Sequence, residues 1–227
     1  MDLLALARGP LLGISMSVFV AGILWRLVGI FLLRGSRHWS QARHRDAWKG
    51  LRLIATRSVP RKEFSGTLFV EVTGYVFHLA FFVALLFYLP HVLFFEDVFK
   101  GLVGLNFSDV AHFRWPILPG DIVYFCAAVS LAGLIVVIVH RLGNPVLRLI
   151  STFDDYFSWL VTAAPVVTGM LAYAHLGSRY ETLLALHIFS LEVLLVWFPF
   201  GKLMHTFSMF VLRGLTGMRF ERKGAAL

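Results

Sequence analysis

Two histidines eighteen residues apart are the side chains of this sequence best spaced to hold metal groups. His187 and His205 are joined by a mostly apolar stretch. Eighteen residues make five turns of an α-helix, so an unbroken helix would place both imidazoles on one face, about 27 Å apart along its axis. A helix this apolar belongs in a lipid bilayer. The spacing therefore predicts two stacked haems, one near each membrane face.

The composition indicates an integral membrane protein. Of 227 residues, 58% are hydrophobic and only 15% are charged, which is too apolar for an ordinary soluble domain. Cys126 is the only cysteine, so the chain has no internal disulfide, no Cys-x-x-Cys-His haem attachment and no four-thiolate iron–sulfur site. Any haem must therefore be bound non-covalently.

Five apolar segments are close to or above the ~20 residues that are needed to cross a hydrocarbon core. They cover residues of about 11–33, 67–95, 121–139, 156–176 and 182–210. The N-terminus lacks the basic start and small-residue cleavage site of a secretory signal, so we expect the first segment to be retained as a membrane anchor. The sequence predicts an all-α integral membrane protein, in which residues 1–227 form a single membrane domain with a bundle of five transmembrane helices.

The distribution of basic residues predicts the orientation. Segment 34–66 contains nine Lys or Arg against two acidic residues, whereas the loop 96–118 contains two Lys or Arg. The nine are Arg34, Arg37, Arg43, Arg45, Lys49, Arg52, Arg57, Arg61 and Lys62. Because cytoplasmic loops carry the positive excess, we expect the N-terminus outside, the C-terminus in the cytoplasm and a multi-pass protein of the inner (cytoplasmic) cell membrane. The net charge of +8 is thus a topology signal and does not indicate a nucleic-acid partner.

This orientation pairs four histidines by depth. In the fifth segment His187 lies near the outer face and His205 near the inner face, and in the second segment His78 lies in the inner half and His91 near the outer end. We therefore expect His78 and His205 to ligate an inner haem iron, and His91 and His187 an outer one. A lone intramembrane histidine more often only hydrogen-bonds between helices, but four that match in depth favour ligation.

The outer pair has a geometric complication. His78 and His91 are thirteen residues apart, about 20 Å along an ideal helix and on different faces of it. Pro90 removes a main-chain hydrogen bond and kinks the helix, so the azimuth of His91 departs from the ideal value. Pro199 affects the spacing in the fifth segment in the same way. Tyr88 is the competing outer ligand, ranked below His91 because tyrosine is an uncommon axial ligand.

Parts of the sequence resemble a known family. The run Phe-Pro-Phe-Gly-Lys-Leu-Met that ends at His205 resembles the Phe-Pro-Phe-Ser-(Lys/Arg)-Leu-x-His motif in the fifth helix of the gamma subunit of respiratory nitrate reductase, a dihaem cytochrome b. The run Arg141-Leu-Gly-Asn-Pro-Val-Leu-Arg148 is similar to the loop between that family's third and fourth helices. Phe77-His78 resembles its first ligand on helix two.

The resemblance covers most of residues 67–210 and extends to a superfamily. Its members include the membrane cytochrome b subunits of complexes related to heterodisulfide reductase and to sulfite reduction. The gamma subunit has its second helix-two histidine at the position of Tyr88, whereas this chain has His91 three residues later. The basic segment 34–66 also looks unlike the nitrate reductase subunit.

The resemblance implies electron transfer through the membrane by two non-covalent, bis-histidine haems b. It implies a dihaem cytochrome b subunit of a respiratory oxidoreductase complex, which passes electrons between membrane quinol or quinone and an iron–sulfur protein subunit on the cytoplasmic face. In the direction we expect, quinol is oxidised near the outer haem and its protons are released outside. The sequence has no nucleotide loop, cysteine cluster or nucleophile motif, so it predicts an electron-transfer subunit without its own terminal reductase site.

Other polar residues in or beside the spans are further candidates. Arg26 would snorkel to the interface or bind a propionate of the inner haem. Glu192 is costly to bury in a membrane, so we expect an interhelical partner for it or a role in proton transfer. His175 is the alternative outer ligand if His91 is not one, and His112 or His175 could contact an outer quinone.

Two other classes of function stay open. One is a transporter whose histidines form a proton relay, which would need inverted repeats or broken helices around a midplane site. The other is a purely structural membrane anchor for a peripheral enzyme. The excess of basic residues in 34–66 predicts contact with anionic lipid or an acidic partner. A visible spectrum of the purified protein separates these hypotheses, because only the cytochrome has a haem band.

Overall fold

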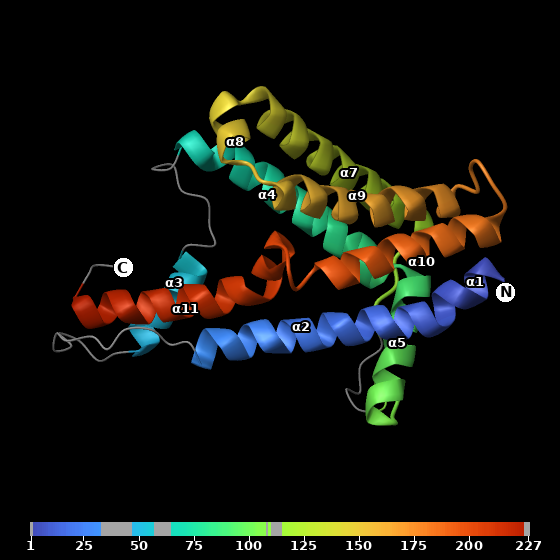
Figure 1. The fold of residues 1–227 in the computed structure, drawn as a ribbon, viewed down its shortest axis with the longest axis horizontal. Helices are drawn as coiled ribbons and strands as arrows, with labels where there is room; N and C mark the ends of the chain where they lie inside the picture. The colour runs from blue at the N-terminus through green and yellow to red at the C-terminus, as the bar shows by residue number, and fades with distance from the viewer. Residues whose placement is uncertain (1, 33–46, 57–64, 108, 110–114, 225–227) are drawn as a thin grey trace. The chain divides into compact units, whose positions relative to one another are not determined.

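The computed structural model describes residues 2–32, 47–56, 65–107, 109 and 115–224, and over these ranges the chain is helical with no strand (Figure 1). Five of the helices are long and apolar enough to cross a membrane. They are Leu3–Leu32, Gly66–Phe87, Gly120–Gly143, Phe153–Tyr173 and Tyr180–Trp197. The predicted all-α fold with five candidate spans is therefore confirmed for the described residues, while the orientation of the termini stays a prediction.

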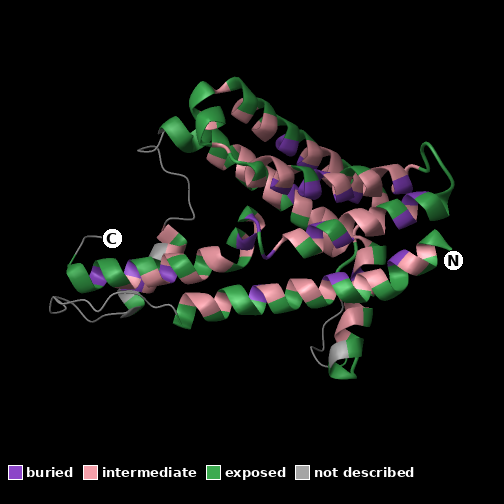
Figure 2. Ribbon diagram, viewed as in Figure 1, coloured by how far each residue is buried: buried purple, intermediate pink, exposed green. Residues whose placement is uncertain are grey.

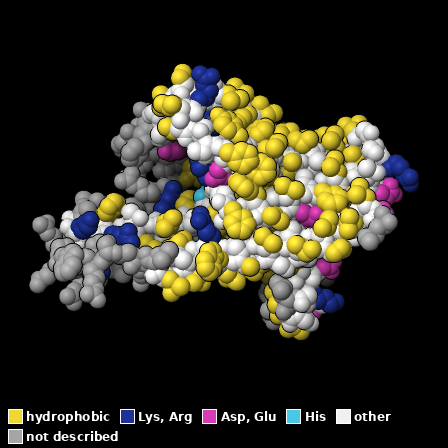
Figure 3. All heavy atoms as spheres, viewed as in Figure 1, with side chains coloured by type: hydrophobic (Ala, Val, Ile, Leu, Met, Phe, Trp, Pro, Cys, Tyr) yellow, Lys and Arg dark blue, Asp and Glu magenta, His cyan; other side chains and the backbone are white. Residues whose placement is uncertain are grey.

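The surfaces of these helices are suited to lipid. Most helical residues are half-buried or exposed (Figure 2). Large apolar side chains such as Leu79, Phe125 and Leu149 are exposed, and apolar side chains gather over the helices in Figure 3. A water-soluble protein would expose far smaller apolar patches. The chain is thus a multi-pass membrane protein.

The chain divides into two compact units, which we describe separately. Unit 1 consists of Met1–Leu68, Ser151–Thr162 and Ile188–Leu227, and unit 2 consists of Phe69–Ile150 and Ala163–His187. The boundary passes through two helices, α9 (Phe153–Tyr173) and α10 (Tyr180–Trp197), so each of these contributes to both units.

Unit 1 contains the N-terminal span and a pair of helices built around glycines. The span consists of α1 (Leu3–Leu6), η1 (Ala7–Leu11) and α2 (Leu12–Leu32), and the pair consists of α3 (Ala47–Thr56) and α11 (His205–Lys223). A Cβ on Gly50 would come within 2.6 Å of the main chain of Met218, and Gly214 lies against Leu51 and Ile54. Only glycine permits this approach, so α3 is held closely on α11. The rest of the predicted basic loop, 33–46 and 57–64, lies outside the described residues.

The fifth predicted segment, 182–210, is two helices instead of one. Helix α10 ends at Trp197, and the short η3 (Lys202–Met204) leads into α11, whose first residue is His205. Pro199 has no N–H to continue the helix. The carbonyl of Trp197 instead accepts the N–H groups of Phe200 and Gly201 at 3.0 and 3.1 Å. The five-turn spacing predicted between the two histidines of this segment therefore does not hold.

Unit 2 contains most of four further helices. They are α4 (Ser65–Phe87), α5 (Leu89–Val103), α7 (Gly120–Gly143) and α8 (Pro145–Ile150), of which α4 begins in unit 1. They are joined in this unit by the second part of α9 and the start of α10.

The second predicted segment, 67–95, also breaks. Tyr88 has an extended backbone (φ −84°, ψ 127°), and Pro90 lies in the first turn of the new helix α5. Because of the break, carbonyl oxygens at the end of α4 lose their helical hydrogen-bond donors. Other residues of unit 2 donate to them instead. Leu86 O accepts the indole N–H of Trp115, and Phe87 O accepts the N–H of Leu118 at 2.9 Å. The kink predicted from the proline is thus a complete change of helix.

Candidate functional site

Two of the predicted ligands lie next to each other in unit 2. The imidazoles of His91, on α5, and His187, on α10, have centroids 6.1 Å apart and planes 23° from parallel. Both side chains are half-buried. The break at Tyr88 starts a new helix, so the azimuth of His91 no longer follows from counting turns of α4. The structure thus brings together the two residues that the sequence analysis assigned to the outer haem.

The tautomer of His91 follows from its hydrogen bond. Its Nδ1 lies 3.1 Å from the carbonyl oxygen of Ala84, in the last turn of α4. A carbonyl can only accept, so Nδ1 must carry the proton and the lone pair of the neutral ring is at Nε2. Ligand histidines commonly donate one ring N–H to a carbonyl and bind the metal through the other nitrogen.

His187 is held in a similar way by α9. Its Nδ1 lies 3.3 Å from the hydroxyl oxygen of Thr168, and that hydroxyl donates its own proton to Ala164 O at 2.7 Å. The hydroxyl oxygen can therefore accept the Nδ1 proton, which leaves the lone pair at Nε2. A Cβ on Gly169 would lie 3.0 Å from Cε1 of His187, so the ring rests directly on the backbone of α9.

The other two predicted ligands have the same Nδ1 contact. Nδ1 of His78 lies 2.6 Å from Gly74 O, and Nδ1 of His205 lies 2.8 Å from Lys202 O. His78, His91 and His205 thus each have Nδ1 on a carbonyl oxygen, which requires the Nδ1–H tautomer, and His187 has Nδ1 on a hydroxyl that can accept its proton. His78 is half-buried in unit 2 and His205 is exposed in unit 1, so the pairing of these two residues stays a prediction.

The centroid spacing of His91 and His187 can be compared with the spacing that a bis-histidine haem needs. Two metal–nitrogen bonds of about 2.0 Å, together with the radii of two imidazole rings, separate the ring centroids by roughly 6 Å. The observed 6.1 Å is of this size, and the two nearly parallel rings form a stacked pair. No group of three or more His, Cys, Asp or Glu that could hold a metal ion occurs among the described residues, but a bis-histidine haem needs only two side chains.

The alternative ligands differ in position, because Tyr88 contacts His91 and His175 lies in the turn after α9. Tyr88 is the N-cap residue of α5, with its ring edge-on to His91 at 5.2 Å and to Tyr173 at 6.1 Å. His175 is exposed, has a positive φ of 52° in the turn after α9, and contacts the ring of Tyr180 at 5.2 Å. His112 lies outside the described residues.

Two charged residues predicted inside the spans differ in burial. Arg26 is exposed on α2, and its pairing with a haem propionate stays a prediction. Glu192 is 6% exposed on α10, and its Oε1 has no hydrogen-bond partner among the described residues. The interhelical partner expected for Glu192 is therefore absent from this part of the chain.

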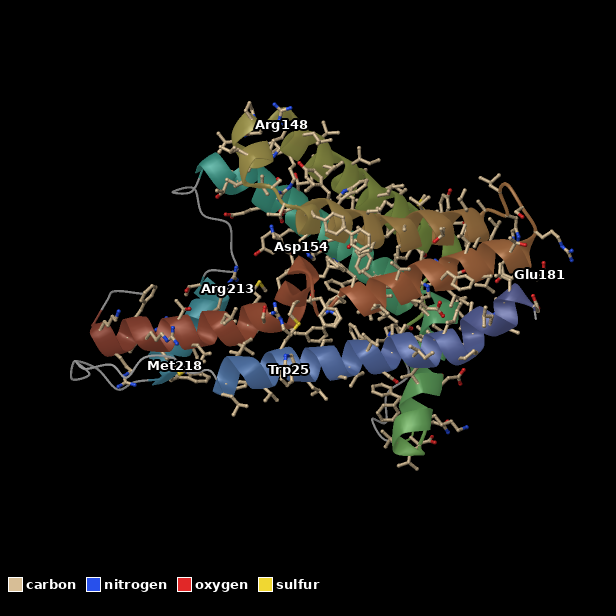
Figure 4. All side chains as sticks on the ribbon, in the orientation of Figure 1. Trp25, Arg148, Asp154, Glu181, Arg213 and Met218 are labelled. Carbon is tan, nitrogen blue, oxygen red and sulfur yellow. The ribbon has the colours of Figure 1, made fainter. Side chains whose placement is uncertain are left out.

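The acidic residues at the start of α9 tie this helix to the break after α10 within unit 1. Asp154, labelled in Figure 4, accepts hydrogen bonds from the Ser158 hydroxyl at 2.7 Å and the Lys202 N–H at 3.1 Å. Asp155 forms an ion pair with the Lys202 ammonium. Asp155 also accepts the Thr152 N–H at 2.9 Å. Capping explains only the last of these contacts. The Lys202 contacts fix the turn that positions His205.

Sequence reasoning missed a pair of polar residues near the histidines. Tyr173, at the end of α9, donates its hydroxyl to Asp121 Oδ1, in the first turn of α7, at 2.9 Å. The ring of Tyr173 also stacks on Tyr124 at 5.2 Å. One signal could have found the pair, because Tyr88, Tyr124 and Tyr173 all fall at the same predicted ends of their spans, where amphipathic rings concentrate.

Fold and site together define a multi-pass helical membrane protein with two facing histidines. The chain is 30% identical over 230 residues to a protein of Nitratidesulfovibrio vulgaris (strain Hildenborough) whose name is given as "Protein", and the match covers 96% of this chain and 94% of that protein. This chain belongs to the same family. No family model and no solved structure matches it.

Proposed function

We propose that this protein is a dihaem cytochrome b, the membrane subunit of a respiratory oxidoreductase complex. It would pass electrons between the membrane quinone pool and an iron–sulfur subunit on the cytoplasmic side of the inner membrane. The observation that carries the proposal is the pair His91 and His187, with centroids 6.1 Å apart and both Nδ1 atoms on acceptors. The resemblance to the nitrate reductase gamma subunit supports it independently.

In this proposal His91 and His187 hold the outer haem, and His78 and His205 hold the inner one. The haems supply one-electron chemistry at iron. The chain positions the ligands: Ala84 and Thr168 fix the outer ring tautomers. The exposed Arg26 on α2 is available to a propionate.

The orientation and partners follow from charge. The basic residues of 34–66 and of α11 would face the cytoplasm and offer a surface for an acidic partner or anionic lipid. The end of unit 2 where α4 ends and α7 begins would face outside and exchange electrons with quinol. Electrons that move inward while protons are released outside make the turnover electrogenic.

A proton-relay transporter is the second candidate. One observation favours it, namely the buried Glu192 carboxyl without a partner for Oε1 among the described residues. The two helix breaks do not favour it, because they follow the ends of the spans Gly66–Phe87 and Tyr180–Trp197 instead of interrupting them.

A reduced-minus-oxidised visible spectrum of the protein purified from membranes tests the proposal. We expect the bands of a b-type haem, and we expect the double variant His91→Ala/His187→Ala to lose the part that belongs to the outer haem. A wild-type protein without any haem band, purified from cells that make haem, would contradict the cytochrome function and leave the transporter or the structural anchor.

A further inference from the structure

A hydrogen-bonded phenol and carboxylate lie at the same end of unit 2 as the outer histidine pair. Tyr173 Oη is 2.9 Å from Asp121 Oδ1. Gly120 makes the contact possible, because a Cβ at this position would be 2.6 Å from Tyr173 Oη. The end of α9 is thus held against the first turn of α7 with the phenol directed at a carboxylate.

Ring contacts connect this pair to the histidines without leaving unit 2. The Tyr173 ring is 6.1 Å from the Tyr88 ring, which is 5.2 Å from the His91 ring, which in turn is 6.1 Å from His187. The phenol–carboxylate pair is therefore two ring contacts away from a predicted haem ligand. A small molecule that contacts the Tyr173 hydroxyl would lie within electron-transfer reach of the outer haem.

The chemistry of the pair suits a proton acceptor. Asp121 is exposed and lies in the first turn of α7, where the helix dipole stabilises a carboxylate. The hydroxyl of Tyr173 donates to Asp121, so its oxygen lone pairs can accept a hydrogen bond from a bound hydroxyl group. A proton that arrives at the phenol oxygen can therefore pass on to Asp121 and then to water. A hydrogen bond that only joined α9 to α7 could use the same two groups. Such a bond would not require that the carboxylate be exposed to water, whereas release of a proton does.

We propose that Tyr173 and Asp121 accept a proton from the quinol hydroxyl during its oxidation, an inference that rests on the proposed function. Oxidation of a quinol to a quinone breaks two O–H bonds and releases two protons and two electrons. The electrons would leave one at a time to the haem that His91 and His187 would hold, which would pass the first electron on before it accepts the second. The first proton moves from the quinol oxygen to Tyr173 Oη as the phenol proton moves to Asp121, and Asp121 then releases it to water. The second proton leaves by the same route once Asp121 is a carboxylate again.

The test uses hydroxyl and carboxylate variants of the full-length protein in detergent. Tyr173→Phe removes only the hydroxyl, Asp121→Asn removes the basic oxygen, and Asp121→Glu keeps a carboxylate. Tyr124→Phe is the matched control, because Tyr124 stacks on the same ring but its hydroxyl has no part in the proposed transfer. Haem content and the dithionite-reduced spectrum are measured first in every variant.

Two readouts then test the pair. We expect Tyr173→Phe and Asp121→Asn to slow reduction of the haem by a soluble quinol by roughly 10²-fold and to change its solvent deuterium isotope effect, with haem content unchanged. Asp121→Glu should recover most of the rate, and Tyr124→Phe should match the wild type. Tyr173→Phe should also weaken binding of a fluorescent hydroxyquinoline quinol analogue by about five-fold, because it loses the accepting phenol oxygen.

The outcomes separate this inference from the proposed function. Wild-type rates and isotope effects in both Tyr173→Phe and Asp121→Asn overturn the inference and leave the cytochrome intact. Equal slowing in Asp121→Asn and Asp121→Glu, with haem retained, also overturns it. If Asp121→Asn loses its haem, the inference is tested by Tyr173→Phe alone. A wild-type rate of haem reduction by quinol and a wild-type affinity for the hydroxyquinoline analogue in that variant then overturn it. A wild-type protein without haem overturns the proposed function itself.

Discussion

Two helix breaks, one in each unit, have opposite effects on the histidines that follow them. In unit 2 the break at Tyr88 starts α5, and His91 on that helix meets His187 at 6.1 Å. In unit 1 the break after Trp197 leads to His205 at the first position of α11, where the side chain is exposed. One break completes a candidate site within its own unit, whereas the other leaves its histidine exposed, and the pairing of that histidine with His78 stays a prediction.

The breaks also differ in how they are held. The carbonyls freed at the end of α4 are satisfied by Trp115 and Leu118, which belong to the segment before α7. The turn after α10 is held by two main-chain hydrogen bonds to the Trp197 carbonyl. Side chains also hold it, through Asp154 and Asp155 on Lys202 and through Pro199 against Gly22 of α2. A proline thus shows that a helix stops, but tertiary contacts decide where the next histidine goes.

The largest effect on haem content is expected from substitution of His91, and little effect is expected from substitution of its neighbour Tyr88. His91→Ala should remove the outer haem and abolish quinol oxidation, because the iron loses an axial ligand. Tyr88→Phe should keep both haems, since it removes only a hydroxyl from a ring that contacts His91 edge-on. In both variants the haem content and the rate of haem reduction by quinol are measured. An intact outer haem in His91→Ala would move the ligand role to another residue, with His175 tested next.

The second prediction concerns the break in unit 1. His205→Ala should remove the inner haem and stop electron delivery to the partner, while the outer haem is still reduced by quinol. Midpoint titration of the remaining haem distinguishes the two sites. Both haems and normal turnover in His205→Ala would show that the inner ligand lies elsewhere.

A smaller effect on haem binding is expected from a substitution at Gly169, which lies against the ring of His187. Gly169→Val places a branched side chain where a Cβ is already 3.0 Å from the ring, so the ring must move or the helices must separate. Overpacking of this kind costs about 1–3 kcal/mol. We expect partial loss of the outer haem and a lower melting temperature. Gly143→Val, at a helical glycine with nothing within 4 Å, is the control and should keep its haem.

The smallest effect is expected from the group that orients His187. Thr168→Val removes the hydroxyl near Nδ1 and keeps the shape, so the outer haem should stay but bind about 10-fold more weakly, with a shifted midpoint potential. Thr162→Val is the matched control, because Thr162 also donates to the carbonyl four residues earlier, at 2.7 Å, in the same helix. Identical midpoint potentials of the outer haem in the two variants would show that the Thr168 hydroxyl does not orient His187.

The sequence predicted the features that depend on local composition. Apolar length identified the five spans, and the choice of His91 over Tyr88 anticipated the contact with His187, although its ligand role stays a prediction. The unbroken segments 67–95 and 182–210 were not predicted correctly, because where a helix resumes after Pro90 or Pro199 depends on distant partners such as Trp115 and Asp154.

Contacts between helices far apart in sequence were not predictable from one chain. Tyr173 and Asp121 are 52 residues apart, and no periodic pattern links them. Glu192 is the opposite case. The free-energy cost of burying its carboxyl predicted a hydrogen-bond partner, but its Oε1 has none among the described residues. Local patterns predict where polar groups lie along a span, but they do not predict which groups on other helices they meet.

The number of haems per chain decides whether both histidine pairs bind a haem. A pyridine haemochrome assay on the purified full-length protein, divided by the protein concentration from amino-acid analysis, gives this number without any partner or substrate. We expect two haems b per chain, one for each histidine pair. One haem would contradict the two-site arrangement, and none would contradict the cytochrome function altogether.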